Sequence, residues 1–345
     1  MAAVLSLTAC SEQDNPNSDP DEPGKKDYAE RLVPVVDPQG KAQGMVTLRF
    51  YDDMPNVAYV SIGNFQGIVY PGTTVHVAKT APDRYLLTSP CGTATVDTAN
   101  DRFESDDYEA FTNMMGLVQP GMPNTIFDAL PMLRWKSIEK TPNNVHVTLD
   151  YGKYGIDLRA DDNDVYFPFA TINDLYANGF MHVAAFNGQT VMVAPNGAYS
   201  LVDGYPAFFT TPILQEKRPA DLVDFNYKNL CFTLTNFHGY SGRSVLEQSG
   251  LKEKGLDKAL QDYGKGGQMT RQLLLSENMY DYMAGTATLS QLFANTLTDV
   301  ITYNQIDKET ASWATLDNVK TAKLEEFNTY CPECASTMLG NMDAW

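Results

Sequence analysis

The chain has 345 residues, and its 43 acidic and 25 basic side chains give a formal charge of −18. Such a charge would repel nucleic acid phosphates and an anionic membrane surface, so we expect neither as a partner. With 43% hydrophobic and 11% aromatic residues the chain falls outside the disordered class, and it is long enough for two or three domains.

The first ten residues end in Leu7, Thr8, Ala9 and Cys10, a pattern typical of bacterial lipoprotein signals. In such signals the cysteine is lipidated and becomes the first residue of the mature chain. The segment before Cys10 has no basic side chain and is short for a secretory signal, so we expect a start placed too late or a trimmed leader. We predict lipidation at Cys10; the alternative is a chance match in an apolar N-terminus.

The segment Ser11–Lys26 carries acidic residues and three prolines but no side chain that could enter a hydrophobic core. Residues 1–27 are therefore predicted to be a leader and a solvated tether. Acidic residues directly after the lipidated cysteine resemble the surface-export signal of Bacteroidota lipoproteins, which indicates the outer membrane, on the cell surface or the periplasmic face. No other window has the ~18 consecutive apolar residues of a spanning helix, so the lipid anchor is the expected membrane link.

Strand patterns dominate the next part of the chain. Val46–Phe50 and Ala58–Val60 flank the turn-prone stretch Asp52–Asn56, which predicts a β-hairpin. Ser61 then stands as the N-cap of a short helix. Further strands are predicted at Thr74–Ala78 and Arg84–Leu87. A turn at Asn100–Asp101 and a second helix from Ser105 onward follow.

The same order of patterns recurs roughly a hundred residues later. Thr171 takes the place of Ser61 as a hydroxyl cap in front of an isoleucine. The other matching segments are Val147–Leu149 with Val46–Leu48 and Val165–Phe167 with Ala58–Val60. We therefore predict two related α+β modules in tandem, residues 28–140 with a connector rich in Pro and Met, and residues 141–215.

The stretch Asp224–Arg243 marks a change to helical patterning. Apolar residues recur at the spacing of one helix face, and Gly239 follows them. A glycine there can adopt the left-handed conformation that often ends a helix. Those residues are Tyr227, Leu230, Cys231, Leu234 and Phe237. Residues 216–345 are predicted to be mainly helical, so the expected fold class is α+β, with two small tandem modules followed by a helical region.

The sequence contains no complete catalytic, metal or cofactor constellation. The acidic run Asp161–Asp164 lacks the Gly and Glu of an EF-hand and is predicted to be a charged hairpin turn. The glycines in Tyr263–Gly267 do not match a phosphate loop and are predicted to mark a flexible connection, and Gly239–Gly242 lacks the spacing of a nucleophile elbow. The histidines lack a zinc motif, so satisfied or surface imidazoles are expected at His76, His146, His182 and His238.

Cys331 and Cys334 form a C-x-x-C pair, compatible with a redox pair, half of a zinc site or a local disulfide. They follow an apparent helix over Asp317–Phe327 rather than preceding one, and Cys91 and Cys231 are isolated in the sequence. A local disulfide or two inert thiols is therefore expected. Cys231, on the apolar helix face, is predicted to lie in the core.

Asp224–Arg243, Gln272–Ser276 and Tyr280–Gly285 resemble the helical region of Bacteroidota lipoproteins in the tail-specific, or C-terminal-processing, serine peptidase family. In those proteins an Asn-Leu-Cys-Phe helix and a Tyr-Gly turn lead to an Asp-Gly-His-Thr element. An α/β core with the nucleophilic serine follows. The tether and the small N-terminal modules fit this family as well, so the resemblance spans about Tyr28–Thr302.

Two departures from that family bear on activity. Asp299–Thr302 reads Asp-Val-Ile-Thr where Asp-Gly-His-Thr is expected, which replaces the imidazole that would move protons. The 43 residues after Thr302 contain no glycine-rich strand end with a serine and leave no room for an α/β core. We therefore expect no catalytic residue, cofactor or metal in this chain.

Two functions follow from these observations. The first is a non-catalytic cell-envelope lipoprotein that binds a peptide or a glycan, or acts as a scaffold, and it predicts an exposed aromatic surface among the tyrosines. The alternative is the N-terminal portion of an active tail-specific serine endopeptidase whose catalytic domain is missing from this chain. It predicts a Gly-rich, Ser-containing segment encoded directly downstream of Trp345.

The lipid anchor is directly testable. When the chain is expressed with a complete secretory signal, we expect it to partition into the detergent phase, because an acyl chain favours an apolar medium by about 0.8 kcal/mol per buried methylene group. The Cys10→Ala variant should move to the aqueous phase. Equal partitioning of both forms would contradict lipidation at Cys10.

Overall fold

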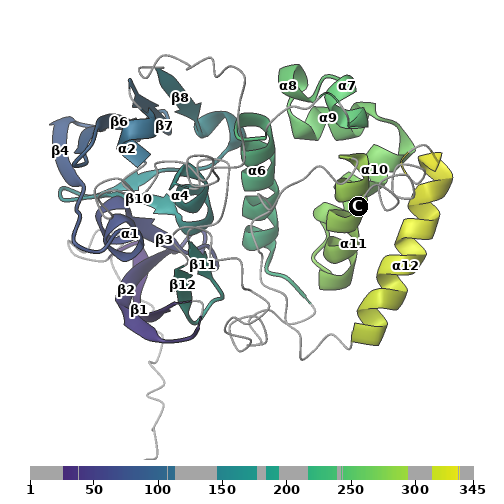
Figure 1. Ribbon diagram of the computed structural model, residues 1–345, viewed down its shortest axis with the longest axis horizontal. Coiled ribbons are helices and arrows are strands. Elements are labelled where there is room, and N and C mark those ends of the chain that lie inside the picture. Colours follow the sequence, from purple (N-terminus) through teal and green to yellow (C-terminus); the bar gives the residue numbers. More distant parts are fainter. Residues whose placement is uncertain are drawn as a thin grey trace, which may run out of the picture.

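The computed structural model describes residues 26–37, 39–106, 108–112, 146–176, 184–193, 217–238, 242, 244–293, 313–332 and 334. Strands come first along the chain and helices follow, with helix α6 (Ala220–Asn236) standing between the two parts (Figure 1). This confirms the predicted α+β class with a mainly helical C-terminal region. Within the described ranges, no helix is both long enough and apolar enough to span a membrane.

The larger sheet has seven strands in the order β11-β12-β1-β2-β3-β10-β9. Its neighbours pair antiparallel except β1 and β12, which are parallel. The predicted hairpin is confirmed, because β2 and β3 pair through Arg49 and Tyr59. The strands are β1 (Tyr28–Val36), β2 (Ala42–Tyr51), β3 (Tyr59–Ser61), β9 (Arg159–Ala160), β10 (Val165–Pro168), β11 (Ala184–Phe186) and β12 (Val191–Val193).

The smaller sheet is an antiparallel meander in the order β4-β5-β6-β7-β8. Alternate side chains of its strands, such as Leu87, Val96 and Phe103, are fully buried, as expected for a sheet with one face on the core. The strands are β4 (His76–Ala81), β5 (Arg84–Thr88), β6 (Thr93–Asp97), β7 (Arg102–Ser105) and β8 (Val147–Asp150). The short helices of this part are α1 (Ile62–Val69), α2 (Tyr108–Thr112), the 3-10 turn η1 (Gly152–Tyr154) and α4 (Phe169–Tyr176).

The two segments predicted as tandem modules are interleaved in both sheets. Strand β8, from the second segment, completes the small sheet by pairing with β7, while β10 and β12 pair with β3 and β1 in the large sheet. One hydrophobic core takes residues from both segments. The strands of residues 141–215 form no sheet of their own, so the boundary predicted after residue 140 does not separate two sheets.

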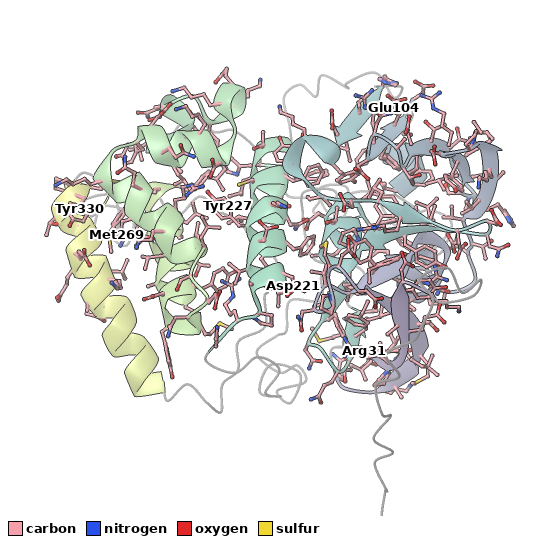
Figure 2. The ribbon with its side chains drawn as sticks, turned by 180° about the vertical axis from the view of Figure 1, so that it is seen from behind. Arg31, Glu104, Asp221, Tyr227, Met269 and Tyr330 are labelled. Atoms are coloured by element: carbon pink, nitrogen blue, oxygen red, sulfur yellow. A yellow bond between two sulfur atoms is a disulfide. The ribbon has the colours of Figure 1, made fainter. Side chains whose placement is uncertain are left out.

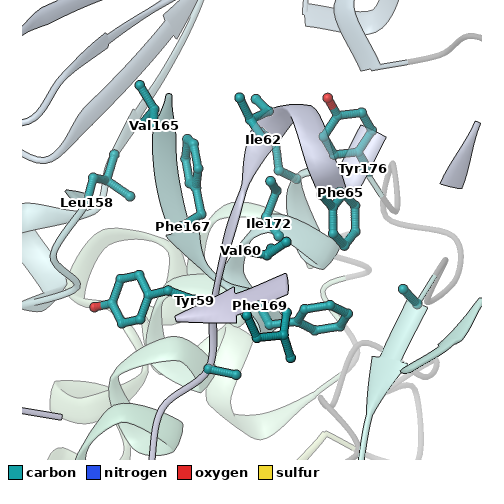
Figure 3. Close-up of a cluster of buried hydrophobic side chains, with 14 of the residues drawn as sticks. Tyr59, Val60, Ile62, Phe65, Leu158, Val165, Phe167, Phe169, Ile172 and Tyr176 are labelled. Carbon is teal, nitrogen blue, oxygen red and sulfur yellow. The ribbon is translucent and has the colours of Figure 1, made fainter. Parts of the chain in front are cut away.

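The strand-to-helix order predicted for both segments is found where they meet, although Val147–Leu149 lies in β8 of the small sheet and its predicted counterpart Val46–Leu48 in β2 of the large one. Strands β3 and β10 pair antiparallel with Val60 opposite Phe167, and each leads directly into a helix, α1 or α4. The two helices share an aromatic cluster in which the ring of Phe65 lies 5.6 Å from Phe169 and 5.4 Å from Tyr176 (Figure 3). The copies therefore stabilise each other across this contact.

The hydroxyl caps of the two copies differ. Ser61 is the N-cap of α1, as predicted, and its oxygen accepts a hydrogen bond from the backbone N–H of Asn64 at 3.2 Å. The cap predicted at Thr171 is wrong, because α4 already begins at Phe169, directly after β10. The Thr171 hydroxyl instead donates to Oδ1 of Asn229 in α6, 2.7 Å away.

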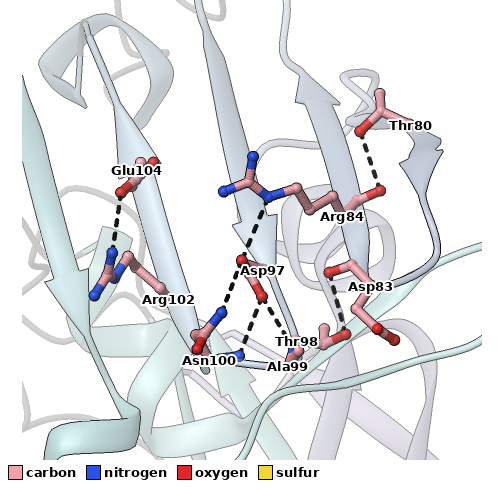
Figure 4. A network of polar contacts seen from close by, with 9 residues as sticks. All are labelled: Thr80, Asp83, Arg84, Asp97, Thr98, Ala99, Asn100, Arg102 and Glu104. Atoms are coloured by element: carbon pink, nitrogen blue, oxygen red, sulfur yellow. Dashed lines mark hydrogen bonds and ion pairs between the residues drawn. The ribbon is translucent and has the colours of Figure 1, made fainter.

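The turn predicted at Asn100–Asp101 is built around the carboxylate of Asp97 (Figure 4). Its Oδ1 accepts hydrogen bonds from the backbone N–H groups of Ala99 and Asn100, each at 3.1 Å. Asp101 has a φ of 47°, and its carboxylate accepts the N–H of Leu158 at 2.7 Å. The tip of the β6–β7 hairpin is thereby fixed to the segment that enters β9.

Helix α6 contributes to two hydrophobic cores. Phe225 and Phe232 join the core of the sheets, whereas Tyr227, Leu230, Cys231 and Leu234 join a second core among the helices. The predicted apolar face is thus confirmed except for Phe237, which packs against the first core. Cys231 lies in the core, as predicted, and burial raises the pKa of its thiol to about 12, so the thiolate is disfavoured.

Further helices follow α6 and share the second core with it, and α12 lies on the side of α10 and α11 away from α6 (Figure 2). They are α7 (Val245–Gln248), α8 (Leu251–Lys254), α9 (Leu256–Asp262), α10 (Lys265–Leu274), α11 (Met279–Leu292) and α12 (Trp313–Tyr330). Cys331 and Cys334 at the end of α12 form a disulfide, one of the two expected states, and both are buried beside the hydroxyl of Tyr263.

The flexible connection predicted at Tyr263–Gly267 is wrong. Gly264, with a φ of 83°, directly precedes α10, and Gly266 and Gly267 are buried in its first turn. A Cβ atom on Gly267 would lie 2.1 Å from the backbone oxygen of Leu260 in α9. Glycine is therefore needed here for the close approach of two helices rather than for flexibility.

A matched pair of substitutions tests this packing. Gly267→Ala should lower the free energy of unfolding by about 2 kcal/mol or more, because backbone atoms must move to admit the methyl group. Gly67→Ala, on the exposed side of α1 with nothing within 4 Å of the new atom, should raise it by ~0.5–1 kcal/mol. Thermal unfolding followed by circular dichroism measures both changes. Equal effects at the two sites would refute the assigned packing of α9 on α10.

Candidate functional site

Several residues singled out in the sequence lie outside the described residues. These are Cys10, His182, Gly239–Ser241 and Asp299–Thr302. The acidic run Asp161–Asp164 forms the predicted hairpin turn, in which the N–H of Asp161 donates to the carbonyl of Asp164 at 3.1 Å. Asp161 also forms a 2.9 Å ion pair with Arg49. Within the described ranges, no cluster of His, Cys, Asp and Glu side chains could hold a metal ion.

His146 lies between a carboxylate and a hydroxyl, an order that resembles a catalytic triad. Its Nδ1 is 2.7 Å from Oδ1 of Asp106, and its Nε2 is 3.1 Å from Oγ1 of Thr148. His146 directly precedes the edge strand β8 and lies two residues before Thr148, so extended backbone alone puts their side chains on one face. Both side chains are exposed to solvent. Acyl transfer needs a water-excluded site with donors for the oxyanion, and an exposed strand edge does not provide such an enclosure.

His238 is a buried side chain rather than a surface imidazole. Its Nε2 lies 3.3 Å from Oε1 of Glu247, and its ring meets Phe293 edge to face at 5.0 Å. Glu247 also completes a capping box with Ser244 at the start of α7. Through these contacts His238 connects the end of α6 to α7, which is a structural role.

A polar pocket of about 490 Å³ lies between α9 and α10. Each helix contributes three side chains at the spacing i, i+3, i+4, which places them on one helical face. The lining residues are Lys258, Gln261 and Asp262 from α9 and Gln268, Arg271 and Gln272 from α10. The lining contains no apolar side chain, so the pocket is a hydrogen-bonding surface.

Asp257 holds two of the residues that line this pocket, Arg271 and Gln261. Its Oδ1 accepts hydrogen bonds from Nε of Arg271 at 2.7 Å and from the hydroxyl of Tyr227 at 2.8 Å. Burial works to raise the pKa of Asp257, but the hydrogen bonds from Arg271 and Tyr227 outweigh it and hold the pKa below its usual range. The Asp257 carboxylate thus joins the Arg271 guanidinium of α10 to the Tyr227 hydroxyl of α6.

Each cation at the pocket has a carboxylate partner. Asp262 receives Nζ of Lys258 at 2.7 Å and Nζ of Lys254 at 3.3 Å, while Arg271 pairs with Asp257.

Two glutamine amides are also partly engaged, because Nε2 of Gln261 donates to Asp257 and Nε2 of Gln268 donates to the carbonyl of Gln261. What remains for a ligand is the amide of Gln272, with the side-chain oxygen and the second amide hydrogen of each of the other two glutamines. Such a set suits a neutral, hydrogen-bonding ligand. The repeated i, i+3, i+4 spacing of polar residues is the sequence signal that could have located it.

The exposed aromatic surface expected from the sequence is not found in the described part of the chain. Most of its tyrosines have buried or half-buried rings, as with Tyr59, Tyr151 and Tyr176. Tyr330, at the end of α12, is 41% exposed, and Nζ of Lys265 lies 5.6 Å from its ring centre (Figure 2). The aromatic residues serve the cores instead, where ring pairs add to their burial.

A second polar group lies buried between α4 and α6. Oδ2 of Asp174 accepts hydrogen bonds from the Thr233 hydroxyl at 2.5 Å and from Nδ2 of Asn229 at 3.1 Å. Its Oδ1 has no hydrogen-bond partner. Burial raises the pKa of Asp174 to about 7, and the two hydrogen bonds only partly oppose that shift. The other titratable groups that interact with it are the buried hydroxyls of Tyr108 and Tyr151.

Comparison with protein-family models, with curated proteins and with solved structures found no match.

The raised pKa of Asp174 sets the direction of a pH dependence. Between its ordinary pKa and about 7 the folded state binds more protons than the unfolded state, so folding stability falls as pH rises through this range. Between pH 5 and pH 8 the ionisation of Asp174 should lower the free energy of unfolding by on the order of 2 kcal/mol. Asp174→Asn should abolish that loss and make the protein more stable at pH 8.

Asp162→Asn is the matched control, because it removes the same charge from a side chain that is 91% exposed. Urea unfolding at several pH values measures the slope. A slope unchanged in Asp174→Asn, or flattened equally in Asp162→Asn, would rule out the assignment.

Proposed function

We propose that this chain is a cell-envelope lipoprotein related to the tail-specific serine peptidases that binds a polar ligand without catalysis. The observation that carries the proposal is the neutral, amide-lined pocket between α9 and α10. The lipoprotein part is supported by Cys10 and the acidic tether, and the relationship by the segments around α6, α10 and α11. An anchored protein with an open, polar binding surface is suited to hold an extracellular ligand near the membrane.

The chemistry of the pocket favours a glycan or the backbone of an extended peptide. Both present neutral donors and acceptors at short intervals, which the amides of Gln261, Gln268 and Gln272 can meet. A peptide recognised through apolar side chains would need apolar pockets, and the lining has none. Its charged side chains are already paired with one another or with Asp257, so a charged ligand gains little there.

The proposed lack of catalysis is supported by the surroundings of two imidazoles. His146 lies with Asp106 and Thr148 at an exposed strand edge, and buried His238 contacts Glu247, which is engaged in the capping box of α7. They are distinct from the pocket residues, so binding and any proton transfer would occur in different places. The alternative, the N-terminal portion of an active serine endopeptidase, remains a prediction about sequence downstream of Trp345.

The pocket prediction uses two glutamines that are exposed on α10. Glycan and peptide arrays should reveal a ligand, and Gln268→Ala and Gln272→Ala should each weaken its binding about 3- to 10-fold, the value of one lost hydrogen bond. Alanine favours helix, so the fold should be kept. Gln39→Ala, on the exposed turn after β1, should bind as the parent does. Titration calorimetry with the ligand recovered from the array measures the affinities.

Three outcomes would count against this function. Binding unaffected by both glutamine substitutions would place the ligand elsewhere, and binding lost in Gln39→Ala would show a general effect on the fold. Saturable labelling of one serine or threonine by a fluorophosphonate probe, with cleavage of unfolded substrates, would replace the binding function with peptidase activity.

A further inference from the structure

Arg218 differs from the other arginines in the described part of the chain. Arg31 is exposed to solvent. Those that form ion pairs with carboxylates are Arg49, Arg84, Arg102, Arg159 and Arg271. Arg218 is fully buried and forms no ion pair with any described carboxylate. A cation enclosed in this way in so acidic a chain calls for an explanation.

The Arg218 side chain is held in one place by three contacts. Its backbone N–H donates to the carbonyl of Glu277 at 2.6 Å, and Nη1 donates to the carbonyl of Ser276 at 2.8 Å. The guanidinium carbon lies 3.8 Å from the ring centre of Tyr282 in α11. The plane of the guanidinium is therefore fixed, which is the preorganisation that a binding group needs.

One edge of this guanidinium is left without partners. Nε and Nη2 are buried and have no hydrogen-bond partner among the residues that the structure describes. These two atoms form the edge that binds both oxygens of a carboxylate or a phosphate in the bidentate arrangement. A buried charge without such a partner costs several kcal/mol of folding free energy. The ligand-free protein is therefore destabilised at a position where an oxyanion would compensate.

The nearby carboxylates do not fill this position. Glu277 pairs with Nζ of Lys217 at 2.9 Å, and the Asp281 carboxylate accepts a hydrogen bond from the Ser276 hydroxyl at 3.2 Å. Asp221, in the first turn of α6, accepts two hydrogen bonds from Asn56 in the β2–β3 turn, each at 2.9 Å. Each of these acidic groups is already engaged by a different partner.

The backbone next to Arg218 adds positive potential. Helix α6 begins directly after Pro219, its N-cap, which makes no side-chain hydrogen bond. The N–H groups at the start of a helix of this length carry a partial positive charge. Lys217, on the other side of Arg218, is already paired with Glu277 and adds no net charge. An anion at Arg218 is therefore favoured by the start of α6 as well as by the guanidinium.

We propose that Arg218 is a binding site for an oxyanion group, a carboxylate or a phosphate, carried by a ligand of this protein. The site is separate from the α9–α10 pocket and does not rest on the function proposed for it. Because Arg218 is enclosed, the oxyanion enters when the surrounding chain opens locally, so association should be slower than a diffusion-limited encounter.

The test measures thermal unfolding of the full chain with sodium phosphate or sodium acetate, each against sodium chloride of equal ionic strength. In the parent, at least one oxyanion should raise the midpoint by a few degrees with saturation in the millimolar range, as expected for binding to the folded state. Comparison of phosphate with acetate identifies the preferred group. A shift that grows linearly without saturation is a general salt effect and would overturn the site.

Two variants and a control locate the effect. Arg218→Met should unfold at a midpoint no lower than the parent without oxyanion, because it removes an unpaired buried charge, and should lose the oxyanion response. Arg218→Lys keeps the charge but not the fork, so its oxyanion affinity should be at least about 10-fold weaker. Arg84→Met, which removes an arginine with a side chain 65% exposed, should keep the full response.

Other results would reject the proposal. A saturable response that persists in Arg218→Met places the oxyanion elsewhere. If the parent shows no oxyanion response and Arg218→Met unfolds at a lower midpoint, Arg218 has a structural role. In that case the Ser276 carbonyl and the Tyr282 ring are sufficient partners for its guanidinium. If Arg218→Met does not fold, the parent and Arg218→Lys decide the question, and equal affinities in these two overturn the bidentate site.

Discussion

Helix α6 is the element on which the rest of the structure depends, because it belongs to two hydrophobic cores at once. Phe225 and Phe232, seven residues apart, pack under the sheets, while Leu230 and Leu234 pack among the helices. Exposure of either side would forfeit about 2 kcal/mol for each large side chain. The strands and the helices are therefore joined by a shared core element and not merely tethered by loops, and the chain from β1 to α11 is expected to be one cooperative structure.

The side of α6 that meets the sheets is not purely apolar, and its polar groups fix how the parts fit. Asn229 accepts from Thr171 and donates to Asp174, and Thr233 donates to the same carboxylate. Such buried hydrogen bonds contribute little net free energy, but a shifted helix would leave every one of these groups unsatisfied. We infer that they select one position of α6 against α4. The unpartnered oxygen of Asp174 makes that selection dependent on pH.

The charge of −18 is distributed so that the two candidate binding sites differ in character. In the α9–α10 pocket each cation has a carboxylate partner, so the pocket offers amides to a neutral ligand. At Arg218 the balance is broken, since a fixed guanidinium keeps two N–H groups without acceptors. The α9–α10 pocket is therefore suited to a neutral group, and Arg218 to an oxyanion. The two proposals are independent, so the two groups can belong to different ligands.

The α+β class, the hairpin of β2 and β3, the Ser61 cap and the apolar face of α6 could be predicted from the sequence, because they depend on the spacing of residues that are close together along the chain. The sequence did not determine that the repeated segments share both sheets, that Thr171 bonds to α6 instead of capping α4, or that Gly267 is a contact between helices. The pairing of Arg271 with Asp257 and the missing partner of Arg218 were equally hidden. Each of these depends on which distant residue arrives opposite, and only the packing of the whole chain decides that.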